Sequence, residues 1–498
     1  MTEQSKNYRH KIDFLLSDNM HLSQPTQTIP VKSKQGKTYK KCNGCNRRRK
    51  PFGEDHQFCR LCYKLKSVFK SSGNKVIDDF IKNTQINLTK SEGKMEFVPY
   101  DQFKNIEFIA EGGFSKIYKA TWIDGPIHWY SISRNIDNIS RLKNDIVVLK
   151  KLVNSKNITS KELNELKIFY QLSSNVSCIC KYYGITQDPI TNDIMIIMPY
   201  YELGDLIHCF SNDFYNINWK SKLYNLQRII CGLRGMHECK IIHRDLHSGN
   251  MFFNKHSGSY HVCIGDLGIS KSATESGENN ENYGIIPYMA PEIFQGYKYT
   301  EVSEIYSYGM IMWEFMTGRR PFWDRNHDTF LIIDICDGLR PPIVTNAPEG
   351  YVKLMKECWN FDPDKRPTTT DIYNKIIEMW KNEEKNCNND IPTKIIKSSD
   401  IGPLTMNNPG AIYKSRPLSK MIHSAMSLRS SKSRSINLEI DKRKFEDLVK
   451  VNDDNGQVTK RKKLCGNEIN EIEFDINMNF NKDYVTLELE FDIDIYNP

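Results

Sequence analysis

Two carboxylates and an amide lie close together near the middle of this 498-residue sequence. Asp245 and Asn250 belong to IIHRDLHSGN, and Asp266 follows sixteen residues after Asn250 in IGDLG. Carboxylate and amide oxygens are the ligands that a hard cation such as Mg²⁺ prefers. The pattern suits Mg²⁺-assisted phosphoryl transfer, in which Asp245 positions an acceptor hydroxyl while Asn250 and Asp266 hold the metal.

A lysine and a glutamate earlier in the chain could complete this chemistry. Lys150 ends a short β-branched run in NDIVVLKKL and can supply a fixed positive charge to nucleotide phosphates. Glu165 lies in the helical pattern KELNELKIFYQL, from which it could pair with Lys150 and hold the lysine in place.

These residues, in this order, resemble the eukaryotic protein-kinase family. Lys150 matches the strand lysine of that family, and Glu165 matches its helix glutamate in preference to Glu162. The remaining motifs are the catalytic loop His243-Arg244-Asp245 to Asn250, the DFG equivalent Asp266-Leu267-Gly268, and the APE motif Ala290-Pro291-Glu292. The resemblance also implies that Glu292 pairs with Arg366.

The resemblance implies an α+β fold of two lobes, a small β-rich one followed by a larger helical one. It implies ATP and Mg²⁺ as cofactors and protein substrates as partners. The catalytic residues it assigns are Lys150, Glu165, Arg244, Asp245, Asn250 and Asp266. The nucleotide-binding residues it assigns are Ala110, Glu111, Gly112, Gly113, Phe114, Ser115, Ile117, Lys150, Met198 and Tyr200.

Several residues depart from the family pattern. Ala110 and Ser115 replace loop glycines, so their side chains would stiffen or crowd the lid over the phosphates. Glu304 replaces the aspartate that braces the catalytic loop, and its greater length leaves open whether the brace is kept. His247 replaces the family's usual residue near the γ-phosphate, and it either faces that phosphate or packs beside the loop.

The segments PYMAPE, WEFMTGRRPF and CWNFDPDKRP resemble the tyrosine-kinase-like group, whose members mostly modify serine or threonine. We therefore expect transfer to Ser/Thr rather than Tyr. The alternative is a pseudokinase scaffold that binds partners through its kinase fold and through an N-terminal zinc module. An active enzyme is preferred because the residues that the reaction needs are all present.

Four cysteines form a second cluster, with the spacing Cys42-x₂-Cys45-x₁₃-Cys59-x₂-Cys62. Paired knuckles of this kind are typical of a structural Zn²⁺ site closed by four thiolates. The alternative is four free thiols in a disordered arm. A basic run, Arg47 to Lys50, lies between the two cysteine pairs. It could bind nucleic acid through residues 31–70, but no aromatic side chains are interleaved with it, so this reading is not favoured. The run could equally be a solvated face or a docking surface for a protein.

Composition narrows the class of protein further. No apolar run is long enough to span a membrane, and the first residues do not form a secretory signal. The other ten cysteines have no regular spacing, as expected for reduced thiols in the cytoplasm or, since the tail carries basic patches, the nucleus. Residues 1–70 carry a net charge of +11, residues 411–463 +8 and residues 464–498 −8.

The expected organisation has five parts. They are a disordered N-terminus (1–39), a four-cysteine zinc-binding module (40–65), a linker (66–100), a protein kinase domain (101–381) and a low-order regulatory tail (382–498).

Overall fold

The computed structural model describes most of the chain between residues 39 and 431. The described residues are 39–52, 57–66, 68–86, 93–112, 115–128, 140–156, 163–173, 176, 178–256, 259–272, 281–404 and 406–431. The expectations for residues 1–38 and 432–498, and for Glu162, Gly113 and Phe114, lie outside them. Within the described residues, no helix is both long and apolar enough to cross a membrane.

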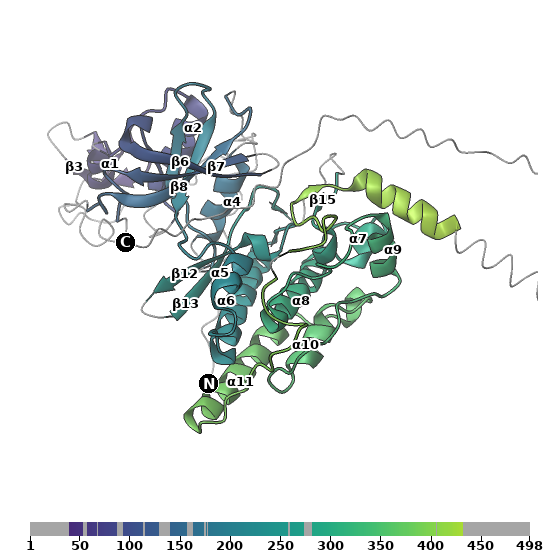
Figure 1. Ribbon diagram of the computed structural model, residues 1–498. Coiled ribbons are helices and arrows are strands. Elements are labelled where there is room, and N and C mark those ends of the chain that lie inside the picture. Colours follow the sequence, from purple (N-terminus) through teal and green to yellow (C-terminus); the bar gives the residue numbers. More distant parts are fainter. Residues whose placement is uncertain are drawn as a thin grey trace, which may run out of the picture. The chain divides into compact units, whose positions relative to one another are not determined.

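The first lobe is built on a six-stranded sheet (Figure 1). Its spatial order is β5 (Glu96–Phe97), β9 (Gly184–Gln187), β10 (Ile194–Pro199), β8 (Asp145–Leu152), β7 (Ser115–Trp122) and β6 (Phe103–Glu111). The pairing of β5 with β9 is parallel, and the other pairings are antiparallel. Helix α4 (Asn164–Leu172) belongs to the same lobe.

Strand alternation in β8 decides where Lys150 points. Val147 and Leu149 are fully buried in a small core with Trp122 on one face of the sheet. Because successive side chains of a strand point to opposite faces, Val148 and Lys150 lie on the other face. On that face the apolar residues join the large core that includes α4 and the second lobe.

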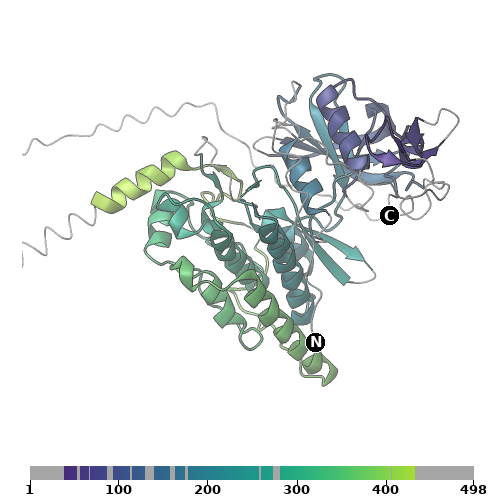
Figure 2. The same cartoon turned by 180° about the vertical axis from the view of Figure 1, so that it is seen from behind.

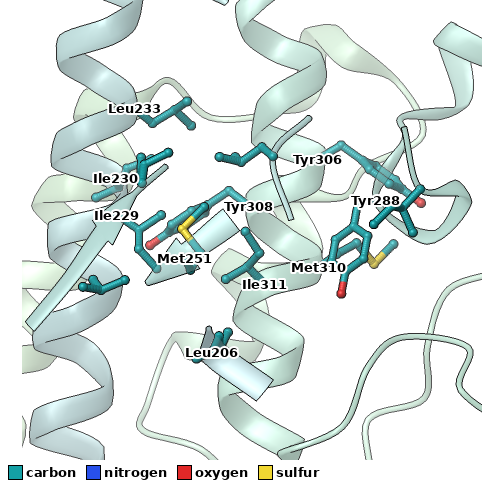
Figure 3. Close-up of a cluster of buried hydrophobic side chains, with 14 of the residues drawn as sticks. Leu206, Ile229, Ile230, Leu233, Met251, Tyr288, Tyr306, Tyr308, Met310 and Ile311 are labelled. Carbon is teal, nitrogen blue, oxygen red and sulfur yellow. The ribbon is translucent and has the colours of Figure 1, made fainter. Parts of the chain in front are cut away.

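The second lobe is helical. Its helices are α5 (Leu206–Asp213), α6 (Trp219–Glu238), α7 (Pro291–Phe294), α8 (Glu301–Thr317), α9 (Thr329–Cys336), α10 (Tyr351–Cys358) and α11 (Thr369–Asn388). Helix α8 begins with a capping box at Thr300 and ends at Gly318, whose left-handed backbone stops the helix. Figure 3 shows apolar side chains of α8 and α6 meeting in the buried core, and Figure 2 shows α11 lying along α6 from behind.

Between α6 and α7 the chain forms short strands that are joined by loops. Strand β11 (Ile241–Ile242) precedes the catalytic-loop motif and pairs with β14 (Lys271–Ser272). The hairpin of β12 (Met251–His256) and β13 (Ser259–Ile264) follows, and Asp266 comes two residues after β13 ends. Strand β15 (Tyr283–Gly284) pairs with β16 (Arg416–Pro417) near the end of the described chain. The expected bilobal kinase fold is confirmed.

The expected linker is shorter than residues 66–100. Helix α2 (Lys75–Ile86) buries Ile77 and Ile81 in the large core, and β5 extends the sheet of the first lobe. Residues 75–86 and 93–99 are therefore part of the folded body. The segment VIDDFIKN lies within α2.

The expected low-order tail does not begin at residue 382. Residues 382–388 complete α11, and residues 389–404 and 406–431 pack against the helical lobe, with Ile401, Ala411, Leu418, Ile422 and Ala425 buried. A Ser/Arg-rich composition suggested low order because these apolar residues are few and widely spaced. Each of them nevertheless finds a complementary surface that only the folded domain provides.

The cysteine module precedes α2. It consists of β1 (Lys40–Lys41) paired with β2 (Arg48–Arg49), β3 (Pro51–Phe52) paired with β4 (Phe58–Cys59), and α1 (Arg60–Leu65). Its small core contains Cys42, Cys59, Cys62 and Leu65, with Phe58 packed against them.

Candidate active site

The ammonium group of Lys150 connects three elements of the fold. Its Nζ donates to both carboxylate oxygens of Glu165 at 3.1 Å and to Asp266 Oδ1 at 2.8 Å. Glu165 also accepts a hydrogen bond from the hydroxyl of Tyr182 at 2.7 Å. The structure thus brings together Lys150, Glu165 and Asp266, which are far apart in the sequence.

One ammonium faces two carboxylates in this group, and burial raises the pKa of Glu165 above its ordinary value although the charge of Lys150 acts to lower it. Burial alone would lower the pKa of Lys150, but the carboxylates of Asp266 and Glu165 outweigh it and raise that pKa above its usual value. Burial alone would raise the pKa of Asp266, and the charge of Lys150 outweighs it in turn, so the pKa lies below its ordinary value. Lysine and aspartate are therefore both ionised at neutral pH.

Two of the site residues have a left-handed backbone conformation. Asp266 has a φ of 56° and Arg244 a φ of 71°, in the left-handed region that non-glycine residues seldom adopt. At Asp266 this conformation accompanies the contact with Lys150 directly after β13. Strained residues of this kind persist only where the surrounding structure holds them, and they often cluster at functional sites.

The catalytic-loop motif folds around Asp245. Asn250 Nδ2 donates to the backbone oxygen of Asp245 at 2.9 Å, and the buried ring of His243 contacts the oxygen of Gly265 at 2.9 Å. Asp245 Oδ1 is buried and has no hydrogen-bond partner among the described residues. An unpaired carboxylate oxygen at this position can accept the proton of an incoming hydroxyl.

His247 packs within the loop, which is the second of the two expected arrangements. Its side chain is buried, and Nδ1 accepts a hydrogen bond from the Gly249 amide at 3.1 Å. Accepting at Nδ1 places the proton of a neutral imidazole on Nε2, which lies 3.5 Å from Asp245 Oδ2. His247 therefore sits beside the carboxylate of Asp245.

Glu304 keeps the brace that the sequence left open. Its Oε1 accepts from the Arg244 amide at 2.7 Å, and its Oε2 lies 2.8 Å from His237 Nε2. Because the carboxylate is buried, both contacts are shielded from water. The longer side chain spans from α8 to α6 and to the catalytic loop at once.

A buried polar network that the sequence analysis missed lies beneath the loop. Glu314 Oε1 accepts from the Tyr288 hydroxyl at 2.7 Å and from Ser248 Oγ at 2.8 Å. Burial raises the pKa of Glu314 to about 8, although these two hydrogen bonds act to lower it. A single acid within the apolar run MIMWEFM was the available signal, since a lone charge in such a run needs a partner.

The pairing that the resemblance implied for Arg366 is confirmed. Its guanidinium donates to both carboxylate oxygens of Glu292 at 2.6 and 2.7 Å. A buried bidentate pair of this kind fixes the end of the activation segment to the start of α11.

The nucleotide-binding candidates lie on adjacent strands. Ala110 pairs with Ile117 between β6 and β7, Ile117 pairs with Lys150, and Met198 pairs with Val148 on β10. The hairpin turn is closed by the Gly112 amide, which donates to the Ser115 oxygen at 2.7 Å, and Glu111 lies 3.6 Å from Lys116. Tyr200 lies just beyond β10, and the Lys119 Nζ is 4.7 Å from the centre of its ring.

Residues 268–288, between the DFG equivalent and the APE motif, form the activation segment. Ser270 is fully buried and its hydroxyl donates to the His243 oxygen, so it is a structural residue. The guanidinium carbon of Arg244 lies 5.3 Å from the centre of the Tyr299 ring. Thr274 and Ser276 lie outside the described residues.

The four cysteines of the N-terminal module converge. The Sγ atoms of Cys42, Cys45, Cys59 and Cys62 all lie within 4.8 Å of one another, and those of Cys45 and Cys59 are 3.9 Å apart. Zn–S bonds of about 2.3 Å in a tetrahedron place sulfurs at nearly this spacing. The donor set therefore fits one Zn²⁺.

The strand pair of β1 and β2 is basic. Lys40 lies opposite Arg49, and Lys41 lies opposite Arg48. Like charges directly opposite one another destabilise a strand pair. Lys40, Lys41 and Arg48 are exposed, so they can be solvated or can contact an acidic partner.

Known proteins resemble this chain over the two lobes. Residues 103–376 match the family of protein tyrosine and serine/threonine kinases. A putative serine/threonine-protein kinase/receptor of Acanthamoeba polyphaga mimivirus is 31% identical over 252 residues, covering 50% of this chain and 15% of that protein. Stress-activated protein kinase alpha of Dictyostelium discoideum is 27% identical over 305 residues, covering 58% of this chain and 43% of that protein.

A probable serine/threonine-protein kinase of Dictyostelium discoideum is 27% identical over 290 residues, 55% of this chain and 15% of that protein. The chain belongs to the protein kinase family. It spans less than half the length of each of these three relatives.

Proposed function

We propose that the chain is a protein kinase that transfers the γ-phosphoryl group of ATP to serine or threonine hydroxyls of proteins. The observation that carries this proposal is the ammonium of Lys150, bonded at once to Glu165 and Asp266. A scaffold without catalysis would not need this buried charge cluster, because removing charges from water can cost more free energy than their pairing returns. The relatives named as serine/threonine kinases support the same activity.

In this mechanism each residue has a defined task. Asp245 accepts the proton of the acceptor hydroxyl through its unpaired Oδ1, and Lys150 neutralises phosphate charge. Glu165 holds Lys150, and the backbone N–H of Arg244 fixes the loop by donating a hydrogen bond to Glu304. The positioned charges stabilise the transferring group without a covalent intermediate.

The metal-binding candidates fit Mg²⁺. The Asp266 side chain is 46% exposed, so it can accept a cation, and the Asn250 amide is oriented by its bond to Asp245. Asp266 and Asn250 would hold Mg²⁺, which when bound neutralises charge on the phosphates. The nucleotide itself would contact the hairpin of Ala110 to Ile117 and the segment from Met198 to Tyr200.

Four further assignments belong to this proposal. The segments around Tyr288 and Arg366 support membership of the tyrosine-kinase-like group, and hence Ser/Thr specificity. The converging thiolates of the N-terminal module support a structural Zn²⁺ site that displays a basic face. We assign protein substrates and regulatory proteins as its partners, with the cytoplasm or nucleus as its compartment.

The test is phosphoryl transfer by the purified full chain, with Mg²⁺ and ATP, onto itself and onto myelin basic protein. Phosphosites are read by mass spectrometry, which separates serine and threonine from tyrosine. Asp245→Asn should reduce transfer at least about a thousandfold while ATP binding persists. Asp101→Asn, the same change at an exposed position, is the matched control and should retain the parent rate. Equal rates in parent and Asp245→Asn would overturn the proposal.

A further inference from the structure

The chain continues beyond the part that matches the family, and this continuation is fastened to the helical lobe. The match ends at residue 376, whereas described residues run to 431. The first anchor is Arg319, which is buried and donates from its guanidinium to the backbone oxygens of Ser399 and Gly402. In return, the Gly402 amide donates to Thr317 at the end of α8.

A second anchor lies at His327, just before α9. Its backbone amide donates to Gly410, its Nδ1 contacts the Ile412 oxygen at 2.9 Å, and its own backbone oxygen accepts from Arg416 at 2.7 Å. The Tyr413 hydroxyl donates to the Pro321 oxygen at 2.9 Å. These hydrogen bonds position residues 411–417 beside the activation segment.

At the activation segment the continuation becomes an added strand. Beyond the pairing of β16 with β15, the Leu418 amide donates to the Asn282 oxygen at 2.8 Å, and the Asn282 amide donates to Ser419 Oγ at 2.9 Å. The Ser419 amide donates to Glu281 at 3.2 Å. Residues 416–419 thus engage β15, the backbone of Asn282 and the side chain of Glu281.

A helix described over residues 419–431 completes this element, which Figure 1 shows in yellow-green near β15, α7 and α9. Leu418 and Ala425 are fully buried and Ile422 nearly so. Arg429 forms an ion pair of 2.8 Å with Asp337, directly after α9. We call residues 411–431 the C-terminal strap.

The strap pairs with a residue that lines a cavity at the catalytic loop. Gly284, which pairs with Arg416 of the strap, lines the same small cavity as Arg244 and Asp245. An acceptor hydroxyl must come within hydrogen-bond reach of Asp245, so the chain that carries it must pass close to this cavity. Exposed strand edges are surfaces to which extended peptides add as a further strand.

We propose that the C-terminal strap is an autoinhibitory element, which occupies the activation-segment edge where an extended protein substrate would otherwise dock. This inference rests on the proposed kinase function. The occupant is the chain's own segment KSRPLSK, whose basic charge and hydroxyls resemble an acceptor peptide. The strap blocks the docking edge and does not distort the catalytic residues, because the hydrogen bonds of Lys150 to Glu165 and Asp266 are formed while the strap is bound.

The test releases the strap by point changes in the full chain. Leu418→Ala combined with Ile422→Ala removes its two buried aliphatic side chains. The matched control combines Ile412→Ala with Leu428→Ala, since these side chains of the strap are 42% and 49% exposed. Hydrogen–deuterium exchange of residues 281–289 and 411–431, without ATP, reports whether the strap is released.

Initial rates with myelin basic protein then report what release does. In the L418A/I422A chain, exchange should accelerate and the KM for myelin basic protein should fall about tenfold, because buried aliphatic truncations shift the closed state by at least this factor. The KM for ATP should not change, and the I412A/L428A chain should match the parent. Unchanged exchange, or accelerated exchange with an equal or higher protein KM, would overturn the proposal.

A binding measurement separates this inference from the activity. A fluorescein-labelled peptide of residues 411–424, with its three serines replaced by alanine, should bind the L418A/I422A chain and not the parent. If no chain transfers phosphate, the proposed function fails. Peptide binding to the released chain would still support the strap as occupant of this edge, and absence of binding would overturn it.

Discussion

Glu304→Gln tests whether the altered brace holds the catalytic loop. The carboxylate is buried on α8 and accepts from the Arg244 amide at 2.7 Å, while its second oxygen lies 2.8 Å from His237 Nε2. Glutamine has nearly the same size and shape but only one acceptor oxygen. Its amide nitrogen would face either the Arg244 N–H or the ring of His237, so one of the two contacts is weakened or lost.

The size of the effect follows from these two contacts. A hydrogen bond to a charged group contributes about 1.5–3 kcal/mol, and the surviving bond also loses its charge assistance. We expect Glu304→Gln to cost about 2–4 kcal/mol of unfolding free energy. For a domain of this size that corresponds to a fall in Tm of about 5–10 °C. Because the loop also carries Asp245, kcat should fall at least about tenfold.

Glu301→Gln is the matched control, because Glu301 lies one turn earlier on α8 and forms an exposed pair of 3.1 Å with Lys240. Exposed pairs contribute little, so its Tm should stay within about 1 °C of the parent. The measurements are thermal unfolding of the three proteins by differential scanning calorimetry and kcat at saturating ATP. Equal Tm values for Glu304→Gln and Glu301→Gln would refute the reasoning.

Three further predictions concern metal binding and stability. Native mass spectrometry should find one Zn²⁺ per chain. Cys42→Ser should release the metal, because three thiolates cannot close the tetrahedron, whereas the control Cys387→Ser should keep it. A folded, metal-free parent would contradict this prediction. Lys222 is fully buried, its Nζ lies 3.7 Å from the centre of the Phe214 ring, and burial lowers its pKa well below the usual value. Lys222→Met should therefore raise the free energy of unfolding by about 1–4 kcal/mol, measured by urea unfolding at pH 7. The reason is that burying the amine costs more free energy than the aromatic contact returns. A variant less stable than the parent would count against this prediction. Burial raises the pKa of Glu314 to about 8, so the folded state keeps a proton that the unfolded state loses near pH 4.5, and stability falls as pH rises between these values. Between pH 5.5 and 7.5 the parent should lose about 2–3 kcal/mol more than Glu314→Gln, and parallel pH profiles would exclude this assignment.

The order and spacing of polar residues could be read from the sequence because they depend on local chemistry. Asp245 follows β11, Asn250 directly precedes β12 and Asp266 follows β13, and their residue types suit a metal and a hydroxyl. The cysteine spacing similarly predicted a cluster, since paired knuckles bring thiols together within one short module. The period of β8 was enough to place Lys150 on a strand.

The sequence could not show contacts whose strength depends on burial. Glu304 differs from the family residue by one methylene, and whether it reaches both His237 and Arg244 depends on the packing of α8 against α6. Glu314 reads as an acid in an apolar run, and only the folded core supplies Tyr288 and Ser248 as partners.

The C-terminal strap shows the same limit most clearly. Residues 411–431 have a composition typical of disorder, because a few spaced apolar residues cannot form a core by themselves. Leu418 and Ile422 become buried only where α9 and the activation segment already present a complementary surface. The sequence by itself determined which residues could do the chemistry, since that depends on residue type and spacing. Tertiary structure decided how they are held and what covers them, since burial and partners come from segments distant along the chain.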